Sequence, residues 1–306
     1  MRYSFDGAAE GDRRRTQYFE MFCNRGIYNE GWTAVTRHST PWMIRAELQP
    51  FEADVWELYD TTTDWSQAQD LAAEMPEKLH ELQRLFLIEA VKYGVLPLDD
   101  RRVERFNAEL AGRPQLVTGN SQLLFGGMGR LTENSLINIK NKSHSVTAAF
   151  VAPDATANGV LIAQGGAFAG WSLYVKDGAP KYCYNLLGVQ RYYIEGESPL
   201  TPGEHQVRME FAYDGDGLAK GGTAALFVDG DKVGEGRIEH TIPLVFSADE
   251  TADVGSDSGT AVTDDYPPDD SRFNGTVNWV QIDVGVDDHD HLITPEERLR
   301  VAAAVQ

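Results

Sequence analysis

The feature that most constrains this chain is a change of hydrophobic rhythm near residue 113. Before it, short strand-like runs precede a region with helical spacing. From about residue 134 onward, apolar residues recur at every second position, as in 146–150 and 207–211. Side chains at every second position lie on one face of a strand, so the later part predicts strands with a buried face. Gly112 and Pro114 supply the chain breakers expected at a domain boundary.

The earlier part predicts an α+β arrangement. Strands are expected at residues 16–22, 32–37 and 55–59, and a short helix at 64–73, where Gln67 follows Asp64 as in a capping box. Pro76 fits the first position of a longer helix that ends before Gly94. The apolar residues of this helix have the spacing of one buried face, which indicates core packing: Leu79, Leu82, Phe86, Ala90 and Tyr93.

The later part predicts antiparallel hairpins. Asp177 with Gly178, and Asp229 with Gly230, each separate two alternating runs. About ten short strands, the last at 277–284, follow one another without a helix, which is typical of an antiparallel sandwich or jelly roll. Thr294 and Pro295 then predict a capped terminal helix.

The expected organisation therefore has three parts. Residues 1–112 form an α+β subdomain with a small antiparallel sheet and helices. Residues 113–288 form an all-β jelly-roll sandwich, and residues 289–306 form a tail with a short C-terminal helix.

Charge limits the partners of this chain. It has 47 acidic and 27 basic residues, so its net charge is −20, which would repel phosphate backbones and anionic headgroups. Neither nucleic acid nor a membrane is an expected partner. The longest apolar run, at 85–88, is too short to span a bilayer, and the first residues carry no secretory signal, so cytoplasmic localisation is expected.

No motif assigns catalytic residues. Cys23 and Cys183 are expected to be buried thiols, and the glycines at 126–129 are expected to form a flexible entry to the sandwich. Glu195 and Glu197 indicate a turn rather than the paired carboxylates of a glycosidase. The histidines have no motif partner, and each is expected to be structural or exposed: His38, His80, His144, His205, His240, His289 and His291.

Residues 245–290 contain twelve acids against one base, Arg272. Carboxylate oxygens are calcium ligands, so the acidic loops at 249–270 are a possible calcium site, although the twelve-residue pattern with its closing Glu is missing. A solvated acidic loop is the preferred interpretation. Residues 287–291, Asp-Asp-His-Asp-His, are competent metal ligands but are adjacent, which favours an exposed linker.

Residues 16–31, continued by Trp32, Thr33 and Ala34, resemble the late segment of bacterial arylsulfatases of the formylglycine type. The similarity continues at 56–60, 64–72 and 76–79. It extends through Asn185 and the loops at 253–255 and 264–266 into a sandwich that resembles laminin-G or concanavalin-A-like domains. The resemblance covers nearly the whole chain. It implies a sulfuric ester hydrolase that acts on aryl sulfates and, when complete, uses a divalent cation such as calcium.

The nucleophile of that family is missing. It arises from a Cys-x-Pro-x-Arg or Ser-x-Pro-x-Arg motif, which neither Cys23 nor Cys183 begins, and Met43 replaces the Arg after Ser39. The resemblance therefore carries over no catalytic, cofactor-binding or metal-binding residue. It implies the C-terminal part of an arylsulfatase that is inactive alone and needs a catalytic N-terminal portion in cis or in trans. The apolar sides of Trp32, Trp56 and the long helix would pack against that portion.

The alternative is a non-catalytic module that binds a glycan or calcium. No cofactor is then expected in this chain, and its ligand is a glycan or a sulfate ester. Five aromatic residues could stack on sugar rings, although such residues are more often part of a core: Trp171, Tyr182, Tyr184, Tyr192 and Tyr193.

Overall fold

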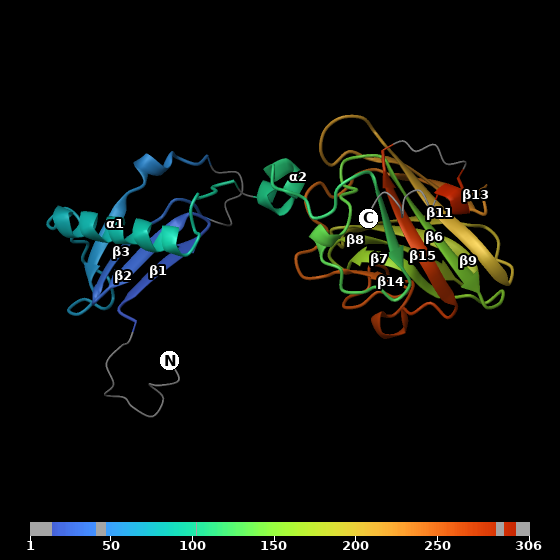
Figure 1. Cartoon of the computed structure of the whole chain (residues 1–306), viewed down its shortest axis with the longest axis horizontal. Coiled ribbons are helices and arrows are strands. Elements are labelled where there is room, and N and C mark those ends of the chain that lie inside the picture. Colours follow the sequence, from blue (N-terminus) through green and yellow to red (C-terminus); the bar gives the residue numbers. More distant parts are fainter. Residues whose placement is uncertain (1–13, 41–46, 102, 286–290, 298–306) are drawn as a thin grey trace, which may run out of the picture. The chain divides into compact units, whose positions relative to one another are not determined.

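The computed structural model of this 306-residue chain describes residues 14–40, 47–101, 103–285 and 291–297 (Figure 1). The chain divides into two compact units between Arg105 and Phe106. The sequence predicted this boundary after Gly112. Because the structure divides the chain earlier, the short helix α2 (Ala108–Ala111) belongs to the second unit rather than to the end of the first. No helix in the described ranges is both long and apolar enough to cross a membrane.

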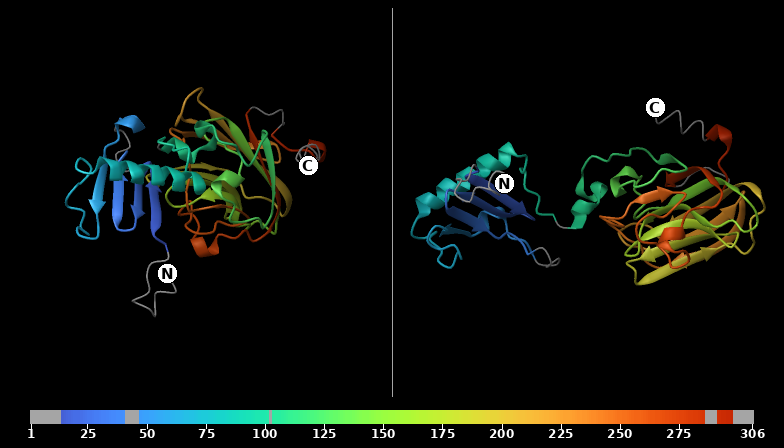
Figure 2. Two further views of the ribbon diagram at one scale, coloured as in Figure 1. Left: turned by 60° about the vertical axis from the view of Figure 1, so that its left-hand side comes forward. Right: turned by 90° about the horizontal axis from the view of Figure 1, so that it is seen from below.

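The first unit is a four-stranded antiparallel sheet with a helix across one face, as the left view of Figure 2 shows. The strands lie in chain order, β1 (Thr16–Met21), β2 (Asn24–Asn29), β3 (Trp32–Thr36) and β4 (Trp56–Asp60). A 3-10 turn, η2 (Phe51–Ala53), precedes β4, and helix α1 (Pro76–Lys92) follows it. The buried core between helix and sheet is Ile27, Ala34, Leu58, Leu82, Phe86 and Ala90. The predicted α+β class is confirmed.

Helix α1 begins and ends as its sequence predicts. Pro76 is its first residue, and Gly94 has φ +67°. Val95 N–H donates to the Ala90 carbonyl and Gly94 N–H to the Val91 carbonyl, which terminates the helix. Tyr93, expected on the buried face, is half exposed and stacks on Tyr18 of β1.

The predicted helix at 64–73 is wrong, because residues 61–75 form turns beside β4. The Asp64 carboxylate accepts hydrogen bonds from the N–H groups of Ala68 and Gln69, and the Asp70 carboxylate accepts from Leu58 and Ala72. These side chains satisfy backbone donors locally, so a helix is not needed to do so.

The expected docking face of the first unit is also corrected. Trp56 contacts Phe86 of α1 with ring centroids 6.0 Å apart, and Lys78 Nζ lies 5.7 Å from the Trp32 ring. The unit's own helix therefore covers the side of the sheet that the resemblance assigned to a missing catalytic portion. The opposite face of β1 leaves Phe19 56% and Met21 68% exposed. The outer side of α1 leaves further apolar residues exposed: Leu87, Ile88 and Val91.

The second unit is a sandwich of two antiparallel sheets, which confirms the predicted all-β class (Figures 1 and 2). Five strands lie in the order β10-β9-β8-β7-β14, and six lie in the order β13-β12-β11-β6-β15-β5. Side chains from both inner faces, including Phe150, Trp171 and Met209, form one core. The strand bounds are β5 Ser121–Phe125, β6 His144–Ala152, β7 Gly159–Gly165, β8 Gly170–Lys176, β9 Ala179–Leu186, β10 Gln190–Glu195, β11 Gly203–Tyr213, β12 Gly222–Val228, β13 Asp231–Ile238, β14 Ala252–Val254 and β15 Thr276–Val284.

The predicted turns of this unit are confirmed. Asp177 and Gly178 connect β8 to β9 and both have positive φ, as do Asp229 and Gly230 between β12 and β13.

Near the C-terminus, residues 295–297 form a helical turn. Thr294 N–H donates to Glu297 Oε2 at 2.7 Å, and Glu297 N–H donates to Thr294 Oγ1 at 3.3 Å, as in a capping box.

The glycines at 126–129 are not a flexible entry to the sandwich. A Cβ on Gly126 would clash with the Val277 carbonyl oxygen, and one on Gly129 would lie 2.7 Å from an Asp253 carboxylate oxygen. Gly127 N–H donates to the Val254 carbonyl. These glycines instead allow close packing of the backbone.

The outer face of the five-stranded sheet is covered by the cover loop, residues 255–275, which includes the 3-10 turn η5 (Pro268–Asp270). Its apolar side chains Val262 and Tyr266 pack on Val160, Tyr174 and Cys183 of that sheet. This third layer leaves little of the sheet face for a ligand.

Candidate functional site

The aromatic residues considered for sugar stacking do not form a platform. Trp171, Tyr182 and Tyr184 are buried and belong to the core between the sheets, and Tyr192 packs against that core. Tyr193 is partly exposed, and its Oη lies 2.9 Å from Oγ1 of Thr263 in the cover loop. The core interpretation, which the sequence already favoured, applies to most of this set.

The acidic loops at 249–270 hold their carboxylates in separate hydrogen-bonded positions. Asp253 accepts from the N–H of Arg130 and from Ser258, Asp257 accepts from Val262 N–H and Tyr266 Oη, and Glu250 accepts from Thr260. Among the residues that the structure describes, no three His, Cys, Asp or Glu side chains converge as metal ligands would. The described carboxylates of these loops therefore do not form the convergent set that a calcium site built on side chains would need.

The string at 287–291 lies almost wholly outside the described residues. Its last member, His291, is described, and its Nδ1 lies 2.7 Å from Glu210 Oε1 while its ring stacks on Phe227. This histidine contacts the outer face of the six-stranded sheet, as a structural residue would.

Neither cysteine is an activated nucleophile. Both are free and buried, as expected. Burial is the main cause that raises the pKa of Cys23 to about 11 and that of Cys183 to about 12. The sequence that comes nearest to the Ser-x-Pro-x-Arg motif is 39–43. Its residues 41–43 lie outside the described residues, and Ser39 Oγ donates to the Phe22 carbonyl.

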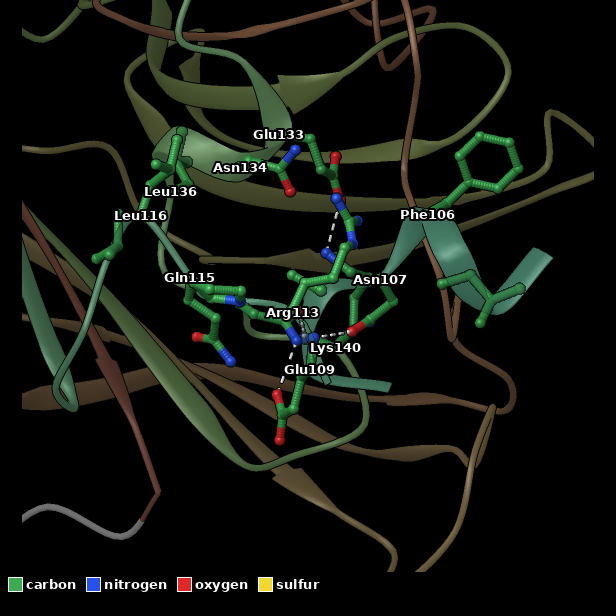
Figure 3. Close-up of a pocket in the computed structure, with 15 residues that line it drawn as sticks. Phe106, Asn107, Glu109, Arg113, Gln115, Leu116, Glu133, Asn134, Leu136 and Lys140 are labelled. Atoms are coloured by element: carbon green, nitrogen blue, oxygen red, sulfur yellow. Dashed lines mark hydrogen bonds and ion pairs between the residues drawn. The ribbon is translucent and has the colours of Figure 1, made fainter. Parts of the chain in front are cut away.

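A pocket of about 270 Å³ opens where residues 106–117 lie beside residues 133–140 (Figure 3). Four amide side chains line it, Asn107, Gln115, Asn134 and Asn138. Four charged side chains line it as well, Glu109, Arg113, Glu133 and Lys140. Its apolar lining includes Phe106, Leu116, Leu136 and Leu244.

The short helix α2 positions one wall of the pocket. Asn107 is its N-cap, and Asn107 Oδ1 accepts from the N–H groups of Glu109 and Leu110 at 3.1 and 3.2 Å. Gly112 ends the helix with φ +65°, and Arg113 N–H donates to the Ala108 carbonyl. The cap and the glycine thereby place Glu109 and Arg113 on the same wall.

A buried ion pair also lines the pocket. Lys140 Nζ is 2.5 Å from Glu133 Oε1, with the two side chains only 6% and 12% exposed. Glu133 also accepts from Gln164 Nε2 at 3.4 Å, and Gln164 Oε1 accepts from Trp171 Nε1 at 3.0 Å. The Phe246 ring lies 4.9 Å from Lys140 Nζ. The sandwich core therefore fixes the position of this pair.

The second carboxylate of the pocket is also paired. Glu109 Oε2 accepts from Lys142 Nζ at 2.7 Å and from Asn138 Nδ2 at 2.9 Å. Burial acts to raise the pKa of Glu109, but Lys142, Asn138 and the nearby charge of Lys140 outweigh it and hold the pKa below its usual range. Glu109 is thus kept ionised.

Sequence reasoning missed this pocket. The one local signal was the Asn107 cap followed by Gly112, which marks a short helix at the start of the second unit. Glu133 begins the 3-10 turn η4 (Glu133–Ser135) and Lys140 lies in the loop before β6, where no periodicity points to a site.

No protein-family model matches the chain, and no curated protein matches it. Solved structures with partial similarity include the Ruminococcus gnavus IT-sialidase CBM40, with 13% identity, 60% of this chain and 96% of that chain covered, and a TM-score of 0.35. Domains LG4-5 of the mouse laminin alpha1 chain have 13% identity, cover 54% and 39% of the two chains and have a TM-score of 0.33. TM-scores of this size carry no argument about function, and no finding supports a sulfatase origin.

Proposed function

We propose that the second unit is a non-catalytic module that binds a glycan in the pocket between α2 and residues 133–140. The observation that carries this proposal is that side chains with hydrogen-bond donors and side chains with acceptors both line one small, open cavity. Each sugar hydroxyl both donates and accepts, so it needs both kinds of partner.

The exposed polar side chains supply both kinds. Asn134 and Gln115 are exposed at the pocket, and an amide side chain presents a carbonyl acceptor and an NH₂ donor. Phe106 and Leu116, also exposed, provide an apolar surface for the C–H face of a sugar ring. A volume of about 270 Å³ lies just below the usual range of ligand pockets, about 300 to 1,000 Å³, which favours one or two sugar units over a long chain.

The pairing of Glu109 and Glu133 argues against a glycosidase. Such an enzyme needs one carboxylic acid with a raised pKa to protonate the leaving group. The pKa of Glu109 is held low, and Glu133 is paired with Lys140. Binding without hydrolysis is therefore the expected outcome.

A glycan array followed by calorimetry tests the proposal. The intact chain should bind at least one glycan class, and the double variant Asn134→Ala with Gln115→Ala should weaken that binding about tenfold, the loss expected for one or two hydrogen bonds. The matched control, Asn278→Ala, removes an exposed amide on β15 that does not line this pocket and should bind normally. Absence of binding to every glycan, or equal losses in variant and control, would contradict the proposal.

A second candidate is the C-terminal part of an arylsulfatase. This candidate needs an interface for the catalytic portion, and the exposed apolar face of β1, with Phe19 and Met21, is a surface of the kind that protein interfaces use. The intact chain should then release no sulfate from 4-nitrophenyl sulfate, with or without calcium. Sulfate release that survives further purification would contradict this candidate.

A further inference from the structure

The charged side chains that line the pocket balance one another. Arg113 and Lys140 contribute the positive charges, and Glu109 and Glu133 contribute an equal number of negative ones, so the formal charge of the lining is zero. The whole chain, in contrast, has a net charge of −20. The pocket is therefore a charge-balanced region of an acidic protein.

Each of these charged groups already has a partner within the protein. Lys140 Nζ lies 2.5 Å from Glu133 Oε1. Glu109 Oε2 accepts from Lys142 Nζ, and Lys142 itself does not line the pocket. Arg113 also has a partner. A charged group on a ligand would therefore have to compete for side chains that are already paired.

Competition at the buried ion pair would be costly. The side chains of Lys140 and Glu133 are only 6% and 12% exposed. An anion that drew Lys140 away would leave the Glu133 carboxylate buried without its partner, and a cation that drew Glu133 away would do the same to the ammonium group. An uncompensated buried charge is strongly destabilising. The pair therefore disfavours ligands of either sign.

The lining side chains with free hydrogen-bonding groups are amides. Asn107 and Asn138 make hydrogen bonds within the protein through both the oxygen and the nitrogen of the amide. In the described part of the chain, no hydrogen bond uses the side chains of Gln115 and Asn134, which are exposed at the pocket (Figure 3). An amide is uncharged and has an acceptor oxygen and two N–H donors, which suits a hydroxyl group.

From this arrangement we infer that the pocket selects an uncharged sugar, whose hydroxyls bond to Gln115 and Asn134, over sugars that bear a carboxylate, sulfate or amine group. The inference rests on the proposed glycan-binding function and deepens it. It also separates the two ligands expected from the sequence, because a sulfate ester is anionic and a plain glycan is not. The exposed Phe106 and Leu116 would contact the C–H face of the same sugar.

The experiment takes the backbone of the tightest-binding glycan on the array in neutral, carboxylated, sulfated and amino-substituted form. Calorimetry measures the binding of each form to the intact chain. The neutral form should bind at least about tenfold tighter than each charged form, because a charged group would lose water without gaining a partner. Its affinity should change less than about twofold between about 50 and about 200 mM NaCl, since salt screens charge pairs.

One variant tests whether charge pairing sets the preference. Glu133→Gln leaves Lys140 without its carboxylate, so the sulfated form should gain at least about tenfold relative to the neutral form. The matched control, Glu235→Gln, changes the net charge equally and breaks an exposed pair with Lys232 that does not line the pocket. It should keep the original preference.

A second variant avoids the buried position, where Glu133→Gln could impair folding. Asn134→Lys adds an unpaired ammonium group at an exposed position of the pocket and should also shift the preference towards the anionic forms. Its control, Asn278→Lys, adds the same charge at an exposed position of β15 and should not. Circular dichroism checks that each variant is folded before its binding is measured.

The outcomes separate the two claims. Binding of a charged form by the intact chain that equals or exceeds binding of the neutral form would overturn the inference and leave the glycan-binding function standing. The inference would also be overturned if the controls shifted the preference as much as the pocket variants, or if neither pocket variant shifted it. Failure of all four forms and of every arrayed glycan would overturn both claims.

Discussion

The hydroxyl of Tyr266 donates a hydrogen bond of 2.7 Å to Oδ2 of Asp257, and both residues lie in the cover loop over the five-stranded sheet. Tyr266 Oη also lies 2.9 Å from Oγ of Ser172 on β8, so the contact connects the loop to the sheet. Asp257 is 2% exposed and also accepts from Val262 N–H. A carboxylate buried in this way makes stability depend on pH.

Asp257→Asn is expected to stabilise the second unit at neutral pH. Burial is the main cause that raises the pKa of Asp257 to about 6, against a value of 3.8 in the unfolded chain. The folded state therefore holds the proton more tightly, and the stability this gives below pH 3.8 is lost as pH rises through 6. Asparagine keeps an acceptor for Val262, so the free energy of unfolding should rise by about 2 kcal/mol at pH 7.5 and not at pH 4.

Urea unfolding at the two pH values measures this difference. Asp269→Asn, an exposed carboxylate of the same loop, is the control and should change little at either pH. A gain that is the same at pH 4 and pH 7.5 would show that titration of Asp257 is not its cause.

His144 is expected to make the same unit sensitive to acid. Complete burial lowers its pKa to about 4, with Nδ1 3.1 Å from the Lys142 carbonyl oxygen and Phe211 beside the ring. As pH falls from 6.5 towards 4, the unfolded chain gains a proton that the folded state resists, and about 3 kcal/mol of stability is lost. His144→Gln should abolish that part of the loss. As a control, His240→Gln at an exposed position should leave the loss of stability in acid unchanged. An acid profile of His144→Gln that equals that of the original chain would show that His144 is not the cause.

The ion pair between Lys140 and Glu133 is expected to behave as a coupled unit. Lys140→Met leaves a buried carboxylate without its partner and should cost about 3 to 5 kcal/mol in the free energy of unfolding. Adding Glu133→Gln removes that charge and should restore most of the loss, so the double variant should be more stable than the single one. A double-mutant cycle by urea unfolding measures the coupling, and additive losses would contradict it.

Neither thiol is expected to react in the folded protein. Cys23 and Cys183 are buried, and burial raises their pKa values to about 11 and about 12, so little thiolate is present at pH 8. Mass spectrometry after iodoacetamide treatment at pH 8 should show no modification of the native chain and two modifications in urea. Rapid labelling of native Cys183 would contradict its position beneath the cover loop.

Predictions from the sequence succeeded where neighbouring residues decide the structure. Helix α1 begins at Pro76 and ends before Gly94, as predicted. Leu82, Phe86 and Ala90 are buried at the predicted spacing. Predictions failed where a side chain competed with the backbone, as at Asp64, whose carboxylate accepts from Ala68 and Gln69. Trp171 was open to two interpretations, because a strand pattern does not tell which face of the sheet becomes the core.

The sequence by itself determined the α+β unit, the antiparallel sandwich and its Asp-Gly turns, because helix periodicity, strand alternation and turn geometry depend on residues a few positions apart. Only the tertiary structure decided where a pocket forms. The pocket joins Asn107 and Arg113 to Lys140 and Leu244, and the packing of the two sheets buries most of the aromatic residues considered for sugar stacking. Such contacts between distant segments arise from the packing of complete elements, which local patterns do not encode.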